Sequence, residues 1–128
     1  MVLRATGAFE IEMRTGDAEL EGAANRHDFT KTYTGDVVGR GIGVMLSGGD
    51  PSEGTAGYVA FEIFHGRVHD AEGSFMLQQF GQMTGGAQRL HYEIVSGSGT
   101  DELTGIAGTL DLTIDEHGHT FELDYTRP

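Results

Sequence analysis

One segment decides the fold of this 128-residue chain: residues 96–108, which read SGSGTDELTGIAG. The segment sets glycine, serine and threonine in a tight loop, continues with a short apolar turn, and ends on Gly108, where a strand begins. Glycine adopts backbone angles that other residues avoid, and short hydroxyl side chains close local hydrogen bonds. An ordinary hairpin needs no connection this long. We therefore expect a plug or corner between two strands, with Leu103 and Ile106 as its apolar anchors.

The sequence on both sides of this segment alternates between apolar and polar residues with a period of two, as half-buried strands do. Eight such runs are separated by turns or loops: residues 8–14, 27–33, 37–46, 58–65, 74–80, 88–95, 109–114 and 120–125. Two longer loops are expected at residues 15–25 and 47–54. Long helical periodicity is absent, and short turns favour antiparallel neighbours.

Eight strands of this kind predict one all-β domain over residues 1–128, either a barrel or a sandwich. Closure into a barrel removes exposed strand edges, and eight strands enclose room for side chains or one small ligand. Glycines at positions 39, 41 and 43 suit the strong coiling that a small barrel requires. We expect an antiparallel up-and-down barrel with little or no helix, and the sandwich is the alternative.

The composition excludes several classes of function. The chain has 20 acidic and 8 basic residues and a net charge of −12, so nucleic acids and anionic membranes are not expected partners. It has no cysteine, which excludes disulfides, thiolate metal sites and a cysteine nucleophile. No apolar stretch is long enough for a signal peptide or a membrane span, so we expect a cytoplasmic protein.

Glu62 is the most suggestive candidate for chemistry. It alternates with Tyr58 and Phe64, which places its carboxylate on a largely apolar strand face. Burial favours the neutral form of a carboxyl group and suits it to proton transfer, with Tyr58 as the expected second proton donor or acceptor. The alternatives are that this face points outward, or that Glu62 pairs with an arginine such as Arg67 or Arg89.

Five further residues are expected to line a ligand site. They are Glu10, Phe64, Gln79, His91 and Tyr92. If the interior is a polar cavity, the Glu10 carboxylate is expected to lie there beside that of Glu62. Otherwise the Glu10 side chain is expected to face solvent. His91 and Tyr92 occupy opposite faces of one strand, and one of these faces should meet the interior.

Other chemistry is not expected. The six histidines are dispersed and predict no metal site. Residues 97–100 (GSGT) lack the lysine and the following helix of a phosphate-binding loop, and Ser98 has no nucleophile elbow around it.

Short motifs spread over nearly the whole chain carry a resemblance to a known family. They include Tyr33-Thr34-Gly35-Asp36, Gly57-Tyr58 with Glu62 and Phe64, Gly73-Ser74-Phe75, Gly97 to Thr100, and Leu123-Asp124-Tyr125. In these motifs the chain resembles the bacterial domain-of-unknown-function family 3224, whose barrel is similar to those of allene oxide cyclases and dirigent proteins. Tyr92 departs from the family, where tryptophan is usual, and so does Gln79, where histidine is common. The resemblance implies a barrel with a pocket for a hydrophobic molecule, and no particular reaction.

The expected function is therefore binding of a small hydrophobic molecule in the barrel lumen, without a cofactor, and an isomerisation or cyclisation is one hypothesis for its use. The alternatives are a non-catalytic carrier or sensor, and a structural oligomer with a filled barrel. Apolar residues lie on both faces of residues 59–64 and 75–77. A covered outer wall, and most simply a homo-oligomer, would explain them.

Overall fold

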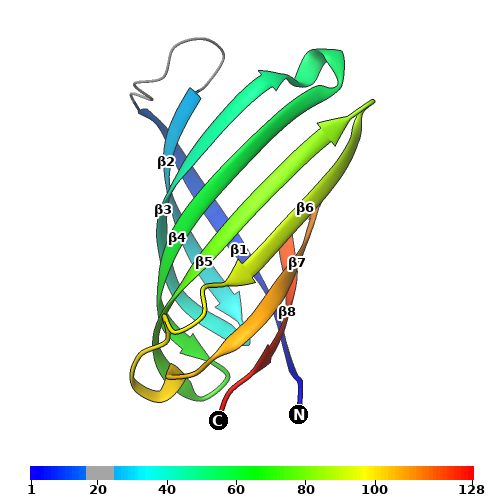
Figure 1. Ribbon diagram of the computed structural model, residues 1–128. Helices are drawn as coiled ribbons and strands as arrows, with labels where there is room; N and C mark the ends of the chain where they lie inside the picture. The colour runs from blue at the N-terminus through cyan, green and yellow to red at the C-terminus, as the bar shows by residue number, and fades with distance from the viewer. Residues whose placement is uncertain (17–24) are drawn as a thin grey trace.

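The computed structural model describes residues 1–16 and 25–128 and contains eight strands that close into an antiparallel barrel in sequence order (Figure 1). The strands are β1 (Leu3–Gly16), β2 (Asn25–Gly35), β3 (Val37–Asp50), β4 (Thr55–Val68), β5 (Ala71–Thr84), β6 (Ala87–Ile94), β7 (Ala107–Asp115) and β8 (Gly118–Thr126). Two single-turn 3-10 helices, η1 (Pro51–Glu53) and η2 (Asp101–Leu103), are the helical elements of the described residues. The predicted barrel with almost no helix is confirmed, and the sandwich is excluded.

The strands are longer than the apolar alternation indicated. The β3–β4 ladder continues from Ser47, opposite Tyr58, to Asp50, opposite Thr55, so the loop expected at residues 47–54 is reduced to η1 and its flanks. Backbone hydrogen bonds extend the ladder through polar residues and glycines that carry no hydrophobic pattern. Residues 17–24 of the other expected loop lie outside the described residues.

The segment 96–108 closes the end of the barrel at which both chain ends lie (Figure 1). Leu103 and Ile106 are fully buried in the core, as predicted. The Ser98 hydroxyl accepts a hydrogen bond from the Met76 backbone N–H at 3.0 Å, and the Thr100 hydroxyl accepts one from Ser74 N–H at 3.1 Å. Beyond the end of β6, these two hydroxyls accept hydrogen bonds from backbone N–H groups of β5 that have no neighbouring strand to pair with.

The core fills the interior of the same end. Val37, Val68, Phe75, Leu123 and Tyr125 pack there around Leu103 and Ile106. Polar side chains enter the interior further along the strands, at Lys31, Glu62 and Gln79. The barrel is therefore apolar and solid at one end and contains a polar group near its middle.

One pair of neighbouring strands in the barrel wall, β6 and β7, is poorly hydrogen-bonded, and we call the boundary between them the seam. These strands pair only at Tyr92–Leu110 and Glu93–Thr109, whereas every other pair of neighbouring strands has a longer ladder. The first part of β6 and the last part of β7 therefore present backbone groups with no partner strand across the seam.

Candidate functional site

A buried ion pair lies at the centre of the barrel. Glu62, on β4, has no exposed surface, and its Oε1 atom lies 2.8 Å from Nζ of Lys31, on β2. The Tyr33 hydroxyl donates to Oε2 at 2.5 Å, and the Gln79 amide donates to Oε1 at 3.0 Å. Both carboxylate oxygens are thus hydrogen-bonded. We call Lys31, Tyr33, Glu62 and Gln79 the Glu62 cluster.

The predicted arginine partners of Glu62 are wrong. Arg67 and Arg89 have exposed positions on β4 and β6, and the residue that pairs with Glu62 is Lys31, the one lysine of the chain. Arg67 differs from Glu62 by an odd number of residues along the same strand, so the two side chains lie on opposite faces.

A glycine lets the ion pair span a strand. β3 lies between β2 and β4, and Gly41 on β3 is directly opposite Lys31. A Cβ atom added at Gly41 would overlap Oε2 of Glu62. Because Gly41 has no side chain, Lys31 and Glu62 meet across β3 in the space that a side chain would fill. This use of the glycine supplements the coiling role predicted from the sequence.

Aromatic rings surround the Lys31 ammonium group. Nζ lies 4.4 Å from the ring centroid of Phe9, 5.2 Å from that of Phe29 and 5.5 Å from that of Tyr92. The ring faces attract the cation, and the Glu62 carboxylate compensates its charge in this buried position. His119 stacks on Phe9 at 5.0 Å, and its pKa is lowered by burial and by the charge of Lys31.

The tyrosines of the interior are hydrogen-bond donors at neutral pH. Burial raises the pKa of Tyr33, Tyr58 and Tyr92, and the negative charge of Glu62 raises the pKa of Tyr33 further. The hydroxyls of Tyr58 and Tyr92 lie 3.4 Å apart. Two protonated phenols that share one hydrogen bond have one hydroxyl proton left for another acceptor.

A cavity of about 270 Å³ opens at the end of the barrel where β3 turns into β4 and β5 into β6. We call it the mouth cavity, and its lining includes Met45, Ala56, Tyr58, Met83 and Leu90. Tyr58 connects this cavity to the Glu62 cluster through Tyr92, whose ring lies beside Lys31. The lining is mainly apolar, with a phenol at its inner side.

The structure brings five of the seven predicted site residues into the interior: Tyr58, Glu62, Phe64, Gln79 and Tyr92. Of these, only Tyr58 lines the mouth cavity, and Phe64 packs in the core against Tyr33 and Phe75. Glu10 and His91 are exposed on the outer face, because each alternates with a buried residue, Phe9 or Tyr92. These two residues are not part of the interior group.

Sequence reasoning missed Lys31 and Tyr33. Phe29, Lys31 and Tyr33 share one face of β2 by strand alternation, and all three are buried. A lone lysine between two aromatic residues on a core-facing strand was the available signal, because lysine is rarely buried without a partner. Such a lysine predicts an ion-pair partner, a carboxylate on another strand.

A second polar group holds the solid end together. Nδ1 of His69, in the β4–β5 turn, lies 2.6 Å from the Tyr125 hydroxyl, and its Nε2 lies 3.7 Å from Asp36. Asp36 in turn accepts a hydrogen bond from the Thr6 backbone N–H at 2.9 Å. This group joins two turns to β1 and β8, so we assign it to stability.

Fold and site together define a small antiparallel barrel with a buried ion pair in its interior and a cavity at one open end. The family model for proteins of unknown function named DUF3224 matches residues 5–125. The chain therefore belongs to the DUF3224 family. No helix among the described residues is long and apolar enough to cross a membrane.

A solved structure agrees with this assignment. The chain is similar to a protein of unknown function from the DUF3224 family of Shewanella oneidensis MR-1, known from a crystal structure. The two sequences are 37% identical, the match covers 100% of this chain and 99% of the other, and the TM-score is 0.94. No curated protein matches the chain.

Proposed function

We propose that this barrel binds a small, largely apolar molecule that carries a hydrogen-bond acceptor, and that it does so in the mouth cavity. The observation that carries the proposal is the cavity itself: about 270 Å³, bordered mainly by apolar side chains, with the phenol of Tyr58 and the polar side chains of Ser47, Gln82 and Gln88. Ligand sites in proteins have this character, mainly apolar with a few placed polar groups, and this cavity is near the lower limit of their usual size.

The chemistry of the lining supports a ligand with an acceptor. Tyr58 and Tyr92 stay protonated because burial raises the pKa of both. When Tyr92 donates the hydrogen bond that the two share, the Tyr58 proton is available to a carbonyl or ether oxygen in the cavity. Met45 and Met83 contribute flexible thioether side chains, which adapt to irregular ligands.

Binding is favoured over catalysis through Glu62. The carboxylate already accepts three hydrogen bonds and has no exposed surface. A cofactor-free isomerisation or cyclisation in the mouth cavity would have Tyr58 as its acid, because Tyr58 is the one of the two predicted proton-transfer residues that borders the cavity. The sequence motifs resemble those of allene oxide cyclase and dirigent barrels, and this resemblance implies an apolar ligand.

The test uses acetophenone, an aromatic ketone, and ethylbenzene, which has the same ring and chain length without the acceptor. Binding is followed by the NMR signals of the methionine methyl groups, of which Met45 and Met83 line the cavity. We expect both probes to shift these two signals in a saturable manner. We expect Tyr58→Phe to weaken acetophenone binding about fivefold, the value of one hydrogen bond near 1 kcal/mol, and to leave ethylbenzene unchanged.

Ala56→Leu is the blocking variant, because it adds volume from the cavity lining. It should abolish binding of both probes while the circular dichroism spectrum stays that of the wild type. Absence of any saturable shift in the wild-type protein would overturn the proposal. So would equal binding by the wild type and a folded Ala56→Leu variant, because the probes would then occupy another place.

A further inference from the structure

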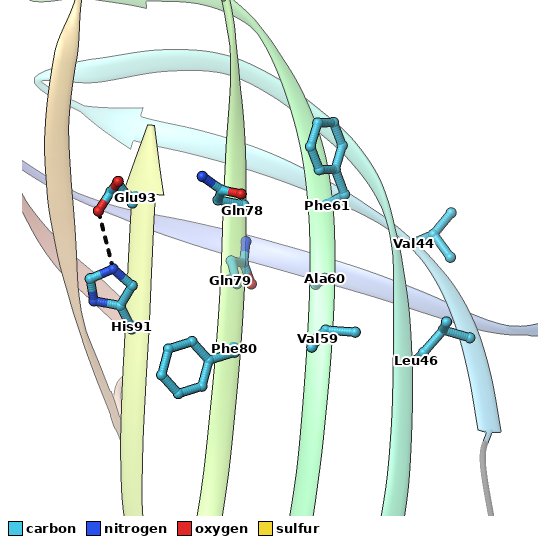
Figure 2. A pocket seen from close by; sticks show the side chains of 10 residues that line it. All are labelled: Val44, Leu46, Val59, Ala60, Phe61, Gln78, Gln79, Phe80, His91 and Glu93. Carbon is cyan, nitrogen blue, oxygen red and sulfur yellow. Dashed lines mark hydrogen bonds and ion pairs between the residues drawn. The ribbon is translucent and has the colours of Figure 1, made fainter. Parts of the chain in front are cut away.

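The outer face of the barrel carries an apolar surface over β3, β4 and β5. Six outward side chains form it, and we call them the outer wall: Ile42, Val44, Val59, Phe61, Ile63 and Phe80. The strand register makes them contiguous, since Ile42 is opposite Ile63, Val44 is opposite Phe61, and Val59 is opposite Phe80. Figure 2 shows Val44, Val59, Phe61 and Phe80 on these neighbouring strands.

The exposure of these side chains is unusual for a strand face that meets water. Ile42 is 58% exposed, Val59 56% and Phe61 45%. The same strands already bury their inner faces, at Phe64 and Leu77 for example. Contiguous exposed apolar patches on soluble proteins mark interaction sites, whereas scattered apolar residues do not.

The centre of the outer wall, on β3 and β4, carries none of the negative charge that dominates the chain, and the nearest carboxylates, Asp28 and Glu93, lie on the flanking strands β2 and β6. The outward positions of β3 from Val38 to Leu46, and those of β4 from Val59 to Arg67, include Arg40, His65 and Arg67 but no carboxylate. The outer faces of β1 and β8, in contrast, carry Glu10, Glu12, Glu122 and Asp124. Two copies with a net charge of −12 each repel one another least when they meet at this wall.

The outer wall has hollows on both sides of its central aromatic ring. Phe61 borders two hollows. One, of about 540 Å³, is lined by Val59 and Phe80 and also by His91 and Glu93, and the other, of about 490 Å³, is lined by Ile42 and Ile63 and also by Arg14, Arg26 and Asp28. A half-exposed ring between two hollows whose floors are largely apolar can enter the equivalent hollow of an identical surface. Such reciprocal contacts are characteristic of a two-fold interface.

We propose that two copies of this chain form a two-fold symmetric dimer by packing their outer walls together. Each Phe61 ring enters a hollow of the partner, and the apolar side chains of β3, β4 and β5 leave water. The mouth cavity lies on a different part of each barrel, so this dimer does not depend on the ligand-binding proposal.

Sedimentation equilibrium of the whole chain tests the dimer. We expect the wild-type protein to have twice the 13.7 kDa mass of the chain at micromolar concentration. Phe61→Glu puts two like charges at the centre of the interface, and it should raise the dimer dissociation constant at least a hundredfold. Ile114→Glu is the matched control: Ile114 is 56% exposed on β7, away from the wall, and this variant should stay dimeric.

A second measurement uses the absence of cysteine in the chain. A single cysteine introduced as Val44→Cys should form an intermolecular disulfide under mild oxidation, and Ile114→Cys should not. A monomeric wild-type protein overturns the proposal, and so does a Phe61→Glu variant that is folded and still dimeric. If the monomer binds vesicles of phosphatidylcholine through the same residues, the wall belongs to a lipid surface instead.

Discussion

Lys31 and Glu62 are the two oppositely charged side chains that the described residues bury completely in the barrel interior, and each depends on the other. Glu62→Gln keeps the shape of the side chain but leaves the ammonium group of Lys31 without a counter-charge. We expect this variant to lose about 3–5 kcal/mol of unfolding free energy, the usual cost of breaking a buried pair from one side. Urea unfolding followed by circular dichroism measures the loss.

The double variant Lys31→Met/Glu62→Gln is the control for this effect. It removes both charges. The amide oxygen of the new glutamine can replace Oε2 and accept from Tyr33, and its NH2 group can donate to the side-chain oxygen of Gln79 once that amide turns over. Because buried pairs replaced by neutral groups cost little, the double variant should be at least about 1 kcal/mol more stable than Glu62→Gln alone. If the double variant is the less stable of the two, the charge argument is incorrect.

Gly41 provides a separate test of the same cluster. Alanine at this position would push its Cβ atom into Oε2 of Glu62 and disturb three hydrogen bonds at once. We expect Gly41→Ala to cost about 1–3 kcal/mol in the same urea experiment, as overpacking of a core does.

Gly57→Ala is the matched comparison for Gly41→Ala, since the nearest atom to its added Cβ lies 3.7 Å away. That variant should change the unfolding free energy by less than about 1 kcal/mol. A similar loss in both variants would mean that strand flexibility, and not the space taken by Glu62, explains the glycine on β3.

At the scale of the strands, the sequence predicted the order and the antiparallel pairing but not the partners across the lumen. Alternation fixes which residues share a face, and so it brought Tyr58, Glu62 and Phe64 to one face of β4. It does not tell which residue of a second-neighbour strand reaches Glu62. The contact between Lys31 and Glu62 depends on the register of both the β2–β3 and the β3–β4 ladder, and on the absence of a side chain at Gly41 between them. The sequence of one strand alone contains neither register.

The seam between β6 and β7 predicts uneven protection of backbone amides. In the first part of β6 and the last part of β7, the N–H groups that face the seam have no partner strand. We expect these amides to exchange with solvent at least a hundredfold faster than the amides at the centre of β4, which is paired on both sides. Hydrogen exchange followed by NMR gives the rates.

The amides of β6 that face β5 serve as the internal control, because they belong to the same strand and are paired. They should exchange slowly. Uniform protection along β6 would show that the seam is closed in solution, by direct pairing or by a partner.

For the molecule as a whole, the tyrosines predict cooperative unfolding in alkali. All four, Tyr33, Tyr58, Tyr92 and Tyr125, have their pKa raised, with burial as the main cause. Because the folded pKa is above that of the unfolded chain, near 10, the associated stability is intact below this pH and is lost as the pH rises above it. Tyrosinate should form together with loss of the circular dichroism signal.

The chain has no tryptophan, so tyrosine alone supplies the ultraviolet titration signal. The same chain unfolded in urea should titrate near pH 10, below the pH at which the folded protein titrates. Gradual titration near pH 10 with the barrel still intact would contradict the burial of these phenols.

Closure of the barrel has a consequence for how the chain is made. The strand that completes the wall, β8, pairs with β1, with Leu3 opposite Tyr125. The two strands are almost the whole chain length apart, and contacts of such long sequence separation form slowly. During synthesis, one edge of β1 therefore has no partner strand until β8 has left the ribosome. Until then the nascent chain exposes a strand to other chains, and a chaperone that covers that edge would protect it.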